Sequence, residues 1–161
     1  MTSNYSKTLT SFLTSRHIWH HLIEFSEPVK TVEQASKQVD AEKIVKSIVM
    51  VDLNGDPLLA IVPAKSKVSH KKLKTLLDVR DVRLATPDEV LRHAGYPAGG
   101  VPPFNKIKRV IVDAQVLKNE TAIVGGGDID KLLEVKTRDI VDVSNAQVDD
   151  ITQTVVGSAT Q

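Results

Sequence analysis

The chain contains no cysteine and few aromatic residues, and both absences narrow the classes of protein to which it can belong. Without cysteine there is no disulfide, no thiol nucleophile and no cysteine-ligated zinc. Aromatic residues make up 4% of the chain, which argues against a protein that stacks single-stranded bases on aromatic side chains. Ile, Val and Leu must therefore fill the core. The longest apolar stretches, such as Pro57–Ala64, are too short to cross a bilayer, so we expect no membrane partner.

The absence of cysteine also fits a reducing compartment, and no apolar signal-peptide segment follows Met1, so we expect a cytoplasmic protein. Residues 1–23 contain no acidic residue and are rich in Ser and Thr, which is a pattern that transit peptides share. The same segment places Leu9, Phe12 and Leu13 on one side of a helix, as an ordinary amphipathic first helix would.

The chain has 161 residues, which predicts a single domain, with an ordinary globular composition of 41% hydrophobic and 25% charged residues. The net charge of +1 gives no overall basic field that would attract nucleic acid. However, residues 65–74 hold five lysines and no acid. Such a run is usually a solvated surface, and its alternative interpretation is a local contact with phosphates.

The pattern of apolar residues, caps and turns predicts an α/β domain of the α+β kind, with a mostly antiparallel mixed sheet surrounded by helices. Thr86-Pro87-Asp88-Glu89 is a strong helix start, and Asn54-Gly55 is a strong hairpin signal. A polar tail at residues 152–161 is expected to be flexible. The expected helices are Ser6–Ser15, one starting at Thr31, Ser69–Leu77, Thr86–His93 and Thr137–Val143; the expected strands are His17–Phe25, Ile44–Leu53, Leu58–Val62, Val82–Leu84, Arg109–Val112, Thr121–Val124, Leu132–Val135 and Gln147–Ile151.

Lys46 departs from the local pattern of its strand. Alternate side chains of a strand share a face, so Lys46 lies with Ile44, Ile48 and Met50. One interpretation is an edge strand protected by an inward charge, or a lysine whose stem packs while its amine reaches water. The other is a cleft lysine that binds an anion such as a phosphate.

Two glycine-rich segments are also unusual. Gly95-Tyr96-Pro97-Ala98-Gly99-Gly100-Val101-Pro102-Pro103 can offer backbone N–H groups to a carbonyl or an oxyanion, or it can be a rigid connector. Gly125-Gly126-Gly127 can line a pocket or form a plain turn. It is neither a P-loop nor a dinucleotide fingerprint, because the required spacing is absent.

The histidines give weaker signals. His17, His20 and His21 resemble a metal cluster, but on a strand they would not share one face and they have no acidic or cysteine neighbour, so we expect no metal site. His93 ends a helix, where it can balance the helix dipole or form a pocket wall. Asp113 follows an apolar strand and can cap the next turn or face a ligand. The sequence has no G-x-S-x-G elbow and no H-E-x-x-H motif, so no side-chain nucleophile is evident for a hydrolysis.

Taken together, these features resemble the YbaK/ProX-type prolyl-tRNA editing domain family, which includes free-standing aminoacyl-tRNA deacylases. The resemblance runs from about Arg16 to Ile151, with residues 152–161 as a tail. It rests on elements that follow the family's order: Thr31–Ala35, the lysine strand Ile44-Val-Lys46-Ser-Ile48, Ile61–Ala64, Leu84–Glu89, the loop with Gly95-Tyr96 and Gly99-Gly100-Val-Pro-Pro103, and Ile111–Asp113.

The resemblance implies a barrel-like, mostly antiparallel sheet and hydrolysis of the ester between a wrong amino acid and the terminal adenosine of a tRNA, tRNA-Pro in particular, without a cofactor or metal. Lys46 matches the family's lysine and Gly99–Pro103 matches its loop, so we expect catalytic roles for Lys46 and Gly100. We expect substrate-binding roles for Gly99, Val101, Pro103 and Tyr96 of the loop, and for His93, Gly125 and Gly126 as candidate pocket residues. The tRNA acceptor end is the expected partner, and prolyl-tRNA synthetase is considered as a second one.

The chain departs from the family at three positions. Gly125 stands where cysteine-removing bacterial members carry a serine, Leu132 stands where they carry an aspartate, and Ala94 replaces a threonine before Gly-Tyr. These changes concern the amino acid removed more than the reaction. Two alternatives to editing stay open: a module that binds aminoacyl-tRNA or a synthetase without hydrolysis, and an enzyme that acts on another small acyl ester.

Overall fold

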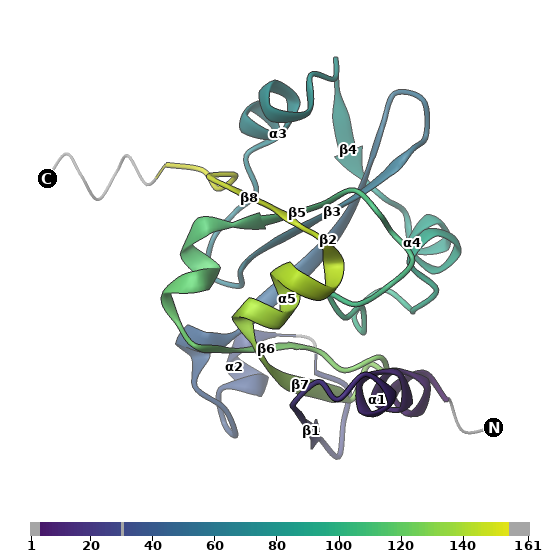
Figure 1. The fold of residues 1–161 in the computed structure, drawn as a ribbon, viewed down its shortest axis with the longest axis vertical. Coiled ribbons are helices and arrows are strands. Elements are labelled where there is room, and N and C mark those ends of the chain that lie inside the picture. The colour runs from purple at the N-terminus through teal and green to yellow at the C-terminus, as the bar shows by residue number, and fades with distance from the viewer. Residues whose placement is uncertain (1–3, 30, 155–161) are drawn as a thin grey trace, which may run out of the picture.

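The computed structural model describes residues 4–29 and 31–154, so part of the predicted flexible tail lies outside the described residues. Its strands form two sheets (Figure 1), a three-stranded sheet in the order β1-β7-β6 and a five-stranded sheet in the order β4-β2-β3-β5-β8. The strands are β1 (His20–Glu24), β2 (Val45–Asp52), β3 (Pro57–Pro63), β4 (Val82–Leu84), β5 (Val110–Asp113), β6 (Thr121–Gly125), β7 (Lys131–Lys136) and β8 (Gln147–Asp149).

Most strand pairings are antiparallel, as the sequence predicted. The exceptions are β3 with β5 and β5 with β8, which run parallel because longer connections separate them along the chain. An isolated parallel bridge between Ile44 and Ile123 joins the start of β2 to β6, and so brings the edges of the two sheets together. The barrel-like enclosure expected from the resemblance thus takes the form of two sheets that meet at this bridge.

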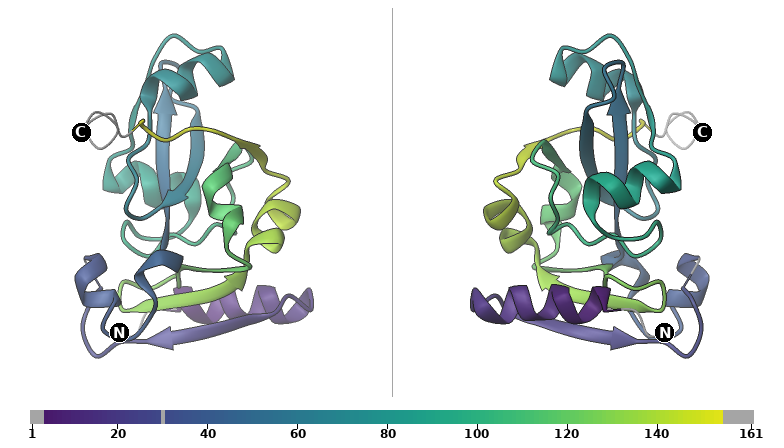
Figure 2. Two further views of the ribbon diagram at one scale, coloured as in Figure 1. Left: turned by 90° about the vertical axis from the view of Figure 1, so that its left-hand side faces the viewer. Right: turned by 90° about the vertical axis from the view of Figure 1, so that its right-hand side faces the viewer.

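Helices cover these sheets as the mixed α/β prediction requires. Figure 2 shows α1 along the three-stranded sheet at one end of the molecule and α3 near the opposite end. The helices are α1 (Tyr5–Ser15), α2 (Val32–Ala35), α3 (His70–Leu77), α4 (Pro87–Ala94) and α5 (Thr137–Ser144), with 3₁₀ turns at Ala41–Lys43 and Ala114–Lys118.

Several helix starts follow from local capping. The Thr86 hydroxyl accepts from the N–H of Glu89, whose carboxylate accepts from the N–H of Thr86. Ser69 caps α3 by accepting from the N–H of Lys72. Thr31 and Gln34 form the same reciprocal pair at the start of α2. The predicted boxes are confirmed, because each satisfies N–H groups that have no partner inside the helix.

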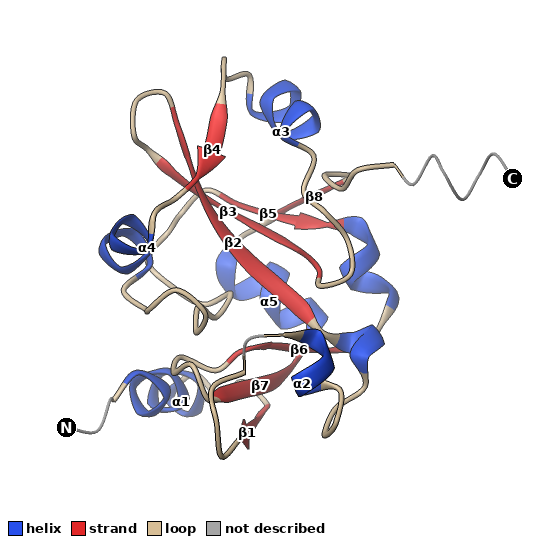
Figure 3. Cartoon of the chain, turned by 180° about the vertical axis from the view of Figure 1, so that it is seen from behind, coloured by secondary structure: helices blue, strands red, loops and turns tan. Residues whose placement is uncertain are grey.

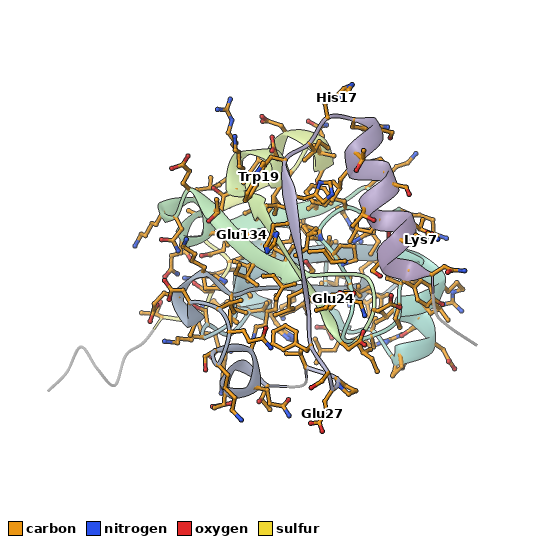
Figure 4. All side chains as sticks on the ribbon, turned by 90° about the horizontal axis from the view of Figure 1, so that it is seen from below. Lys7, His17, Trp19, Glu24, Glu27 and Glu134 are labelled. Carbon is orange, nitrogen blue, oxygen red and sulfur yellow. The ribbon has the colours of Figure 1, made fainter. Side chains whose placement is uncertain are left out.

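The predicted strand His17–Phe25 is wrong at its beginning. His17 has a φ of 58°, its N–H donates to the carbonyl of Thr14, and the N–H of Ile18 donates to that of Leu13. These bonds form a Schellman turn that ends α1, so the chain becomes extended only at His20. Figure 4 shows β1 crossing this end of the molecule beside α1. His17 and His21 therefore do not share a strand face.

The larger core lies between the five-stranded sheet, the three-stranded sheet and helices α1, α4 and α5, and it is aliphatic, as the scarcity of aromatic residues requires. Leu59 and Ile61 are fully buried there. A second core, which includes Met50 and Leu73, fills the other face of the five-stranded sheet under α3. Burial of this apolar surface is the main driving force that holds β2 and β3 in place.

No helix in the described ranges, 4–29 and 31–154, has the length and apolar character needed to span a membrane.

Candidate functional site

A pocket of about 380 Å³ opens where the start of β2 meets the two glycine-rich segments. Figure 3 shows β2 running from this region, beside α2, toward β4 at the other end of the molecule. The lining residues come from distant parts of the chain and are Val29, Thr31, Ala35, Ile44, Val45, Lys46, Ser47, Ala64, Gly99, Val101, Gly125 and Leu132. The wall is therefore mainly aliphatic, with few polar groups.

Lys46 carries the one charge of this lining. On β2 it stands opposite Val62 of β3 and shares a face with Ile48 and Met50, as the strand alternation predicted. Its ammonium has no hydrogen bond or ion pair with any described residue. Burial, and to a smaller extent the positive charge of Lys67, lower the pKa of Lys46. A cation in that position is prepared to bind an anion, because an anionic ligand would offset both unfavourable effects.

The Gly/Pro loop, residues 95–103, lines the same pocket as Lys46 through Gly99 and Val101, and its backbone is already partly engaged. The N–H of Gly100 donates to the carbonyl of Pro97 at 2.9 Å, and the carbonyl of Gly100 accepts from the N–H of Gly127 at 2.8 Å. By contrast, the N–H groups of Gly99 and Val101 have no partner among the described residues. Both residues line the pocket, so their N–H groups are the loop donors that remain for a ligand.

Gly125, Gly126 and Gly127 are required by close backbone contacts. A Cβ on Gly125 would overlap the carbonyl group of Val101, and one on Gly100 would lie 2.5 Å from the carbonyl oxygen of Gly127. A Cβ on Gly126 would lie 2.7 Å from the carbonyl carbon of Lys131. The turn and the Gly/Pro loop thus pack backbone against backbone. Gly125 lines the pocket and leaves no space for the serine that some family members carry.

The other predicted site residues lie outside this lining. Pro103 is buried, and its carbonyl accepts from Ser144. Tyr96 is half-buried, and its ring lies 6.0 Å from that of Tyr5. His93 has an Nε2 atom that is buried without a partner in the described chain. Gly126 donates to the carbonyl of Lys131. The substrate contacts predicted for these residues stay predictions.

Other candidates from the sequence have structural roles. Asp113 is buried, and its carboxylate accepts from the N–H groups of Gln115 and Ile151. Of the two roles that the sequence allowed for Asp113, the structure thus shows the turn cap. His20 bonds through Nδ1 to the carbonyl of Ile18. Over residues 4–29 and 31–154, no three His, Asp or Glu side chains are grouped as a metal site would need.

Sequence reasoning missed most of the pocket wall. Val29, Ala35 and Ala64 carry no polar group, and only the fold brings them beside Lys46. Thr31 was noted for its cap and Leu132 as a departure from the family, so these two gave a signal. Ser47 is a polar lining residue whose Oγ is buried and has no hydrogen-bond partner within residues 4–29 and 31–154.

The fold and pocket define a class: a small α/β domain with a mainly aliphatic pocket that is lined by one lysine and by residues of two glycine-rich segments. A model of the aminoacyl-tRNA editing domain matches residues 26–143, and the chain belongs to this family.

Curated relatives include the proline–tRNA ligase of Thermotoga neapolitana, which is 33% identical over 104 residues, or 63% of this chain and 18% of the ligase. The ligase of Nitratidesulfovibrio vulgaris strain DP4 is 35% identical over 115 residues, or 68% of this chain and 20% of the ligase. The chain thus spans about a fifth of these relatives' length.

Solved structures share this fold. The hypothetical protein APE2540 is 29% identical with a TM-score of 0.81, covering 90% of this chain and 99% of that one. A proposed trans-editing enzyme for prolyl-tRNA synthetase is 25% identical with a TM-score of 0.83, covering 96% and 100%.

Proposed function

We propose that this protein hydrolyses the ester of a mischarged tRNA, tRNA-Pro in particular, as a free-standing editing enzyme. The observation that carries the proposal is the pocket that the unpaired Lys46 lines together with Gly99 and Val101. Membership of the aminoacyl-tRNA editing domain family supports the substrate class. The proline–tRNA ligases among the relatives support the choice of tRNA, and make prolyl-tRNA synthetase a candidate partner.

The proposed chemistry needs positioning more than a side-chain nucleophile, because an aminoacyl ester is already activated. Lys46 binds the phosphate or ribose of the terminal nucleotide. The N–H groups of Gly99 and Val101 orient the aminoacyl carbonyl and stabilise the oxyanion. Water attacks the carbonyl carbon, the bond to the ribose oxygen breaks, and that oxygen takes the proton, with help from the neighbouring ribose hydroxyl. Gly100 fixes the loop through its two backbone bonds.

The lysine-rich segment 65–74 is the proposed contact for the rest of the acceptor end. The ammonium of Lys65 is 2.6 Å from Glu42, and that of Lys72 is 2.8 Å from Asp150, so these two charges are already balanced. Lys67, Lys71 and Lys74 have no ion pair among the described residues. We therefore assign the phosphate contacts to these three lysines.

The test is deacylation of tRNA-Pro charged in turn with alanine, cysteine, serine and proline. We expect rapid ester loss for at least one non-cognate amino acid and a large loss of rate in Lys46→Ala and in Gly100→Ala. Lys118→Ala is the matched control, since it removes an exposed lysine from a 3₁₀ turn outside the pocket lining. Unchanged rates in folded Lys46→Ala and Gly100→Ala would show that the assigned site is wrong.

A non-catalytic module that binds aminoacyl-tRNA or a synthetase is the second candidate. Gly125 favours it, because the serine of related deacylases has no space here. Saturable binding without hydrolysis of any aminoacyl-tRNA in the panel would establish this alternative. Hydrolysis of acyl esters that lack the adenosine would instead indicate a general esterase.

A further inference from the structure

Helix α1 lacks a cap of its own. Its N-cap residue, Asn4, makes no side-chain capping bond, and its first turn contains no acidic residue. The first N–H groups of a helix have no partner within it, and a carboxylate beside them is favourable. Asp128 supplies one from 122 positions away: its buried Oδ2 accepts from the N–H of Ser6 at 3.1 Å.

Backbone contacts continue from α1 into the glycine turn. Gly127 has a φ of 97°, and a Cβ there would lie 2.8 Å from the backbone nitrogen of Ser6 and 2.9 Å from the carbonyl carbon of Tyr5. The start of α1 therefore rests directly on Gly127. Figure 1 shows α1 beside the connection between β6 and β7, which contains this turn.

The same turn contacts the Gly/Pro loop on its other side. The N–H of Gly127 donates to the carbonyl of Gly100, and a Cβ on Gly100 would meet the Gly127 carbonyl. The rings of Tyr5 and Tyr96 make a second connection between α1 and the loop. Three layers of backbone thus lie against one another: the first turn of α1, the turn 125–128 and the loop 99–101.

We propose that Asp128 is a positioning residue: by capping α1 it fixes Gly127, and through Gly127 it fixes the loop whose Gly99 and Val101 line the pocket. The part that concerns catalysis rests on the proposed function. Because the family model matches residues 26–143, the capped helix lies outside the matched region. The loop has no regular secondary structure of its own, so its geometry depends on such supports.

The first experiment compares Asp128→Ala with Asp128→Asn, which retains an oxygen acceptor for the Ser6 N–H. For Asp128→Ala we expect kcat of deacylation to fall about tenfold while KM changes less than twofold, because a small displacement of positioning groups acts on the reacting geometry. Asp128→Asn is expected to restore most of kcat. Asp130→Ala is the matched control, since the Asp130 carboxylate pairs with Lys131 and makes no hydrogen bond to α1 among the described residues.

Hydrogen exchange measured by NMR gives a readout that does not depend on activity. In Asp128→Ala the amides of Gly127 and Gly100 are expected to exchange at least tenfold faster, while amides in β3 keep their protection.

Unchanged exchange at Gly127 and Gly100 in folded Asp128→Ala overturns the proposal, whatever the activity. Faster exchange in a protein that deacylates no aminoacyl-tRNA supports the positioning role and refutes only the proposed function. Faster exchange with normal kcat shows that the loop tolerates the loss, and overturns the catalytic part of the role. An equal fall in kcat for Asp130→Ala would show a general charge effect and would overturn it as well.

Discussion

The two ends of β2 open onto pockets of similar size whose charged groups differ in whether they have partners on the protein. At the start of the strand, Lys46 lines a pocket of about 380 Å³ and has no described partner. At its end, a pocket of about 370 Å³ is lined by Asp52, Asp81 and Arg83, among others. There Asp52 pairs with Arg109 at 3.1 Å, Arg83 pairs with Glu89 at 2.8 Å, and Asp81 accepts from the N–H of Val82.

The difference shows which charge is available for a ligand. At the hairpin end each of these charges has a partner on the protein, so the charges stabilise the turn and a ligand would have to break existing bonds. At the other end, the ammonium of Lys46 is partly buried and has no negatively charged partner among the described residues. A bound anion would supply that partner. Pocket volume alone does not separate the two ends, whereas the pairing of charges does.

The largest expected effect is the loss of activity in Lys46→Met. The substitution keeps the apolar stem and removes the charge, so we expect kcat/KM of deacylation to fall about 100-fold, as loss of a charge-assisted contact of about 3 kcal/mol implies. Stability in urea should stay the same or rise, since no ion pair is broken and a desolvated cation is removed. A marked loss of stability would show that Lys46 has an unseen structural partner, and would remove the contrast between the two ends.

The next largest effect is expected in a comparison of two glycines, Gly125 in the Lys46 pocket and Gly55 in the hairpin between β2 and β3. In Gly125→Ser the new Cβ overlaps the Val101 carbonyl, so the loop must shift; we expect a fall in kcat/KM of about tenfold and a loss of about 1–3 kcal/mol in unfolding free energy. Gly55→Ala is the control: Gly55 has a φ of 81° but nothing within 4 Å of a Cβ. It should cost about 1–2 kcal/mol through backbone strain alone and leave deacylation unchanged. Full activity in Gly125→Ser would mean that the loop position is not critical.

Local sequence rules predicted most of the fold, because short-range hydrogen bonds decide helix starts and turns. The Thr86–Glu89 box, the Ser69 cap and the Asn54-Gly55 turn needed only neighbouring residues. The beginning of β1 was predicted wrongly, because the residue types that follow His17 favour an extended backbone. The actual turn at His17 depends on hydrogen bonds to carbonyls at the end of the preceding helix. Parallel pairing of β5 and β8 depends on connections that local patterns do not specify.

The site was only partly predictable for a related reason. Lys46 stands out because it breaks an apolar alternation, and the loop stands out by composition. Val29 and Ala64 have no such signal, because an aliphatic residue in a pocket has the same pattern as one in the core. Asp128 also gave no signal in the sequence, since the N–H group that its carboxylate accepts from belongs to Ser6, 122 positions away, and a backbone N–H carries no sequence pattern.

Arg109→Met tests the hairpin end. It leaves the Asp52 carboxylate, which is 7% exposed, without its ion pair, so we expect unfolding free energy to fall by about 1–3 kcal/mol while deacylation stays normal. Burial opposes ionisation of Asp52, but hydrogen bonds from Asp56, Arg109 and Asn54 outweigh it and lower its pKa. Equilibrium urea unfolding with parallel deacylation assays would check this. A loss of activity without a loss of stability would mean that the hairpin end takes part in function.

The smallest effect is expected at the ion pair between Arg83 and Glu89, which lies at the start of α4. The hydrogen bonds from Arg83 and from the N–H of Thr86 lower the pKa of Glu89 from 4.5 to about 2. A carboxylate with a lowered pKa contributes stability at pH values above the pKa of the unfolded state, and this contribution is lost as the pH falls from about 4.5 toward 2.

Glu89→Gln keeps the capping oxygen for Thr86 but removes the charge. It should therefore be slightly less stable than the unsubstituted protein at pH 7, with the gap closing as the pH falls through that range. Asp88→Asn, which changes an acid of the same helical turn that has no ion pair among the described residues, should show a smaller pH dependence. A difference in stability that stays constant from pH 7 to pH 3 would assign the stabilisation to the capping bond alone. The ion pair between Arg83 and Glu89 would then contribute nothing measurable to stability, and the pairing of charges at the hairpin end of β2 would not explain its stability.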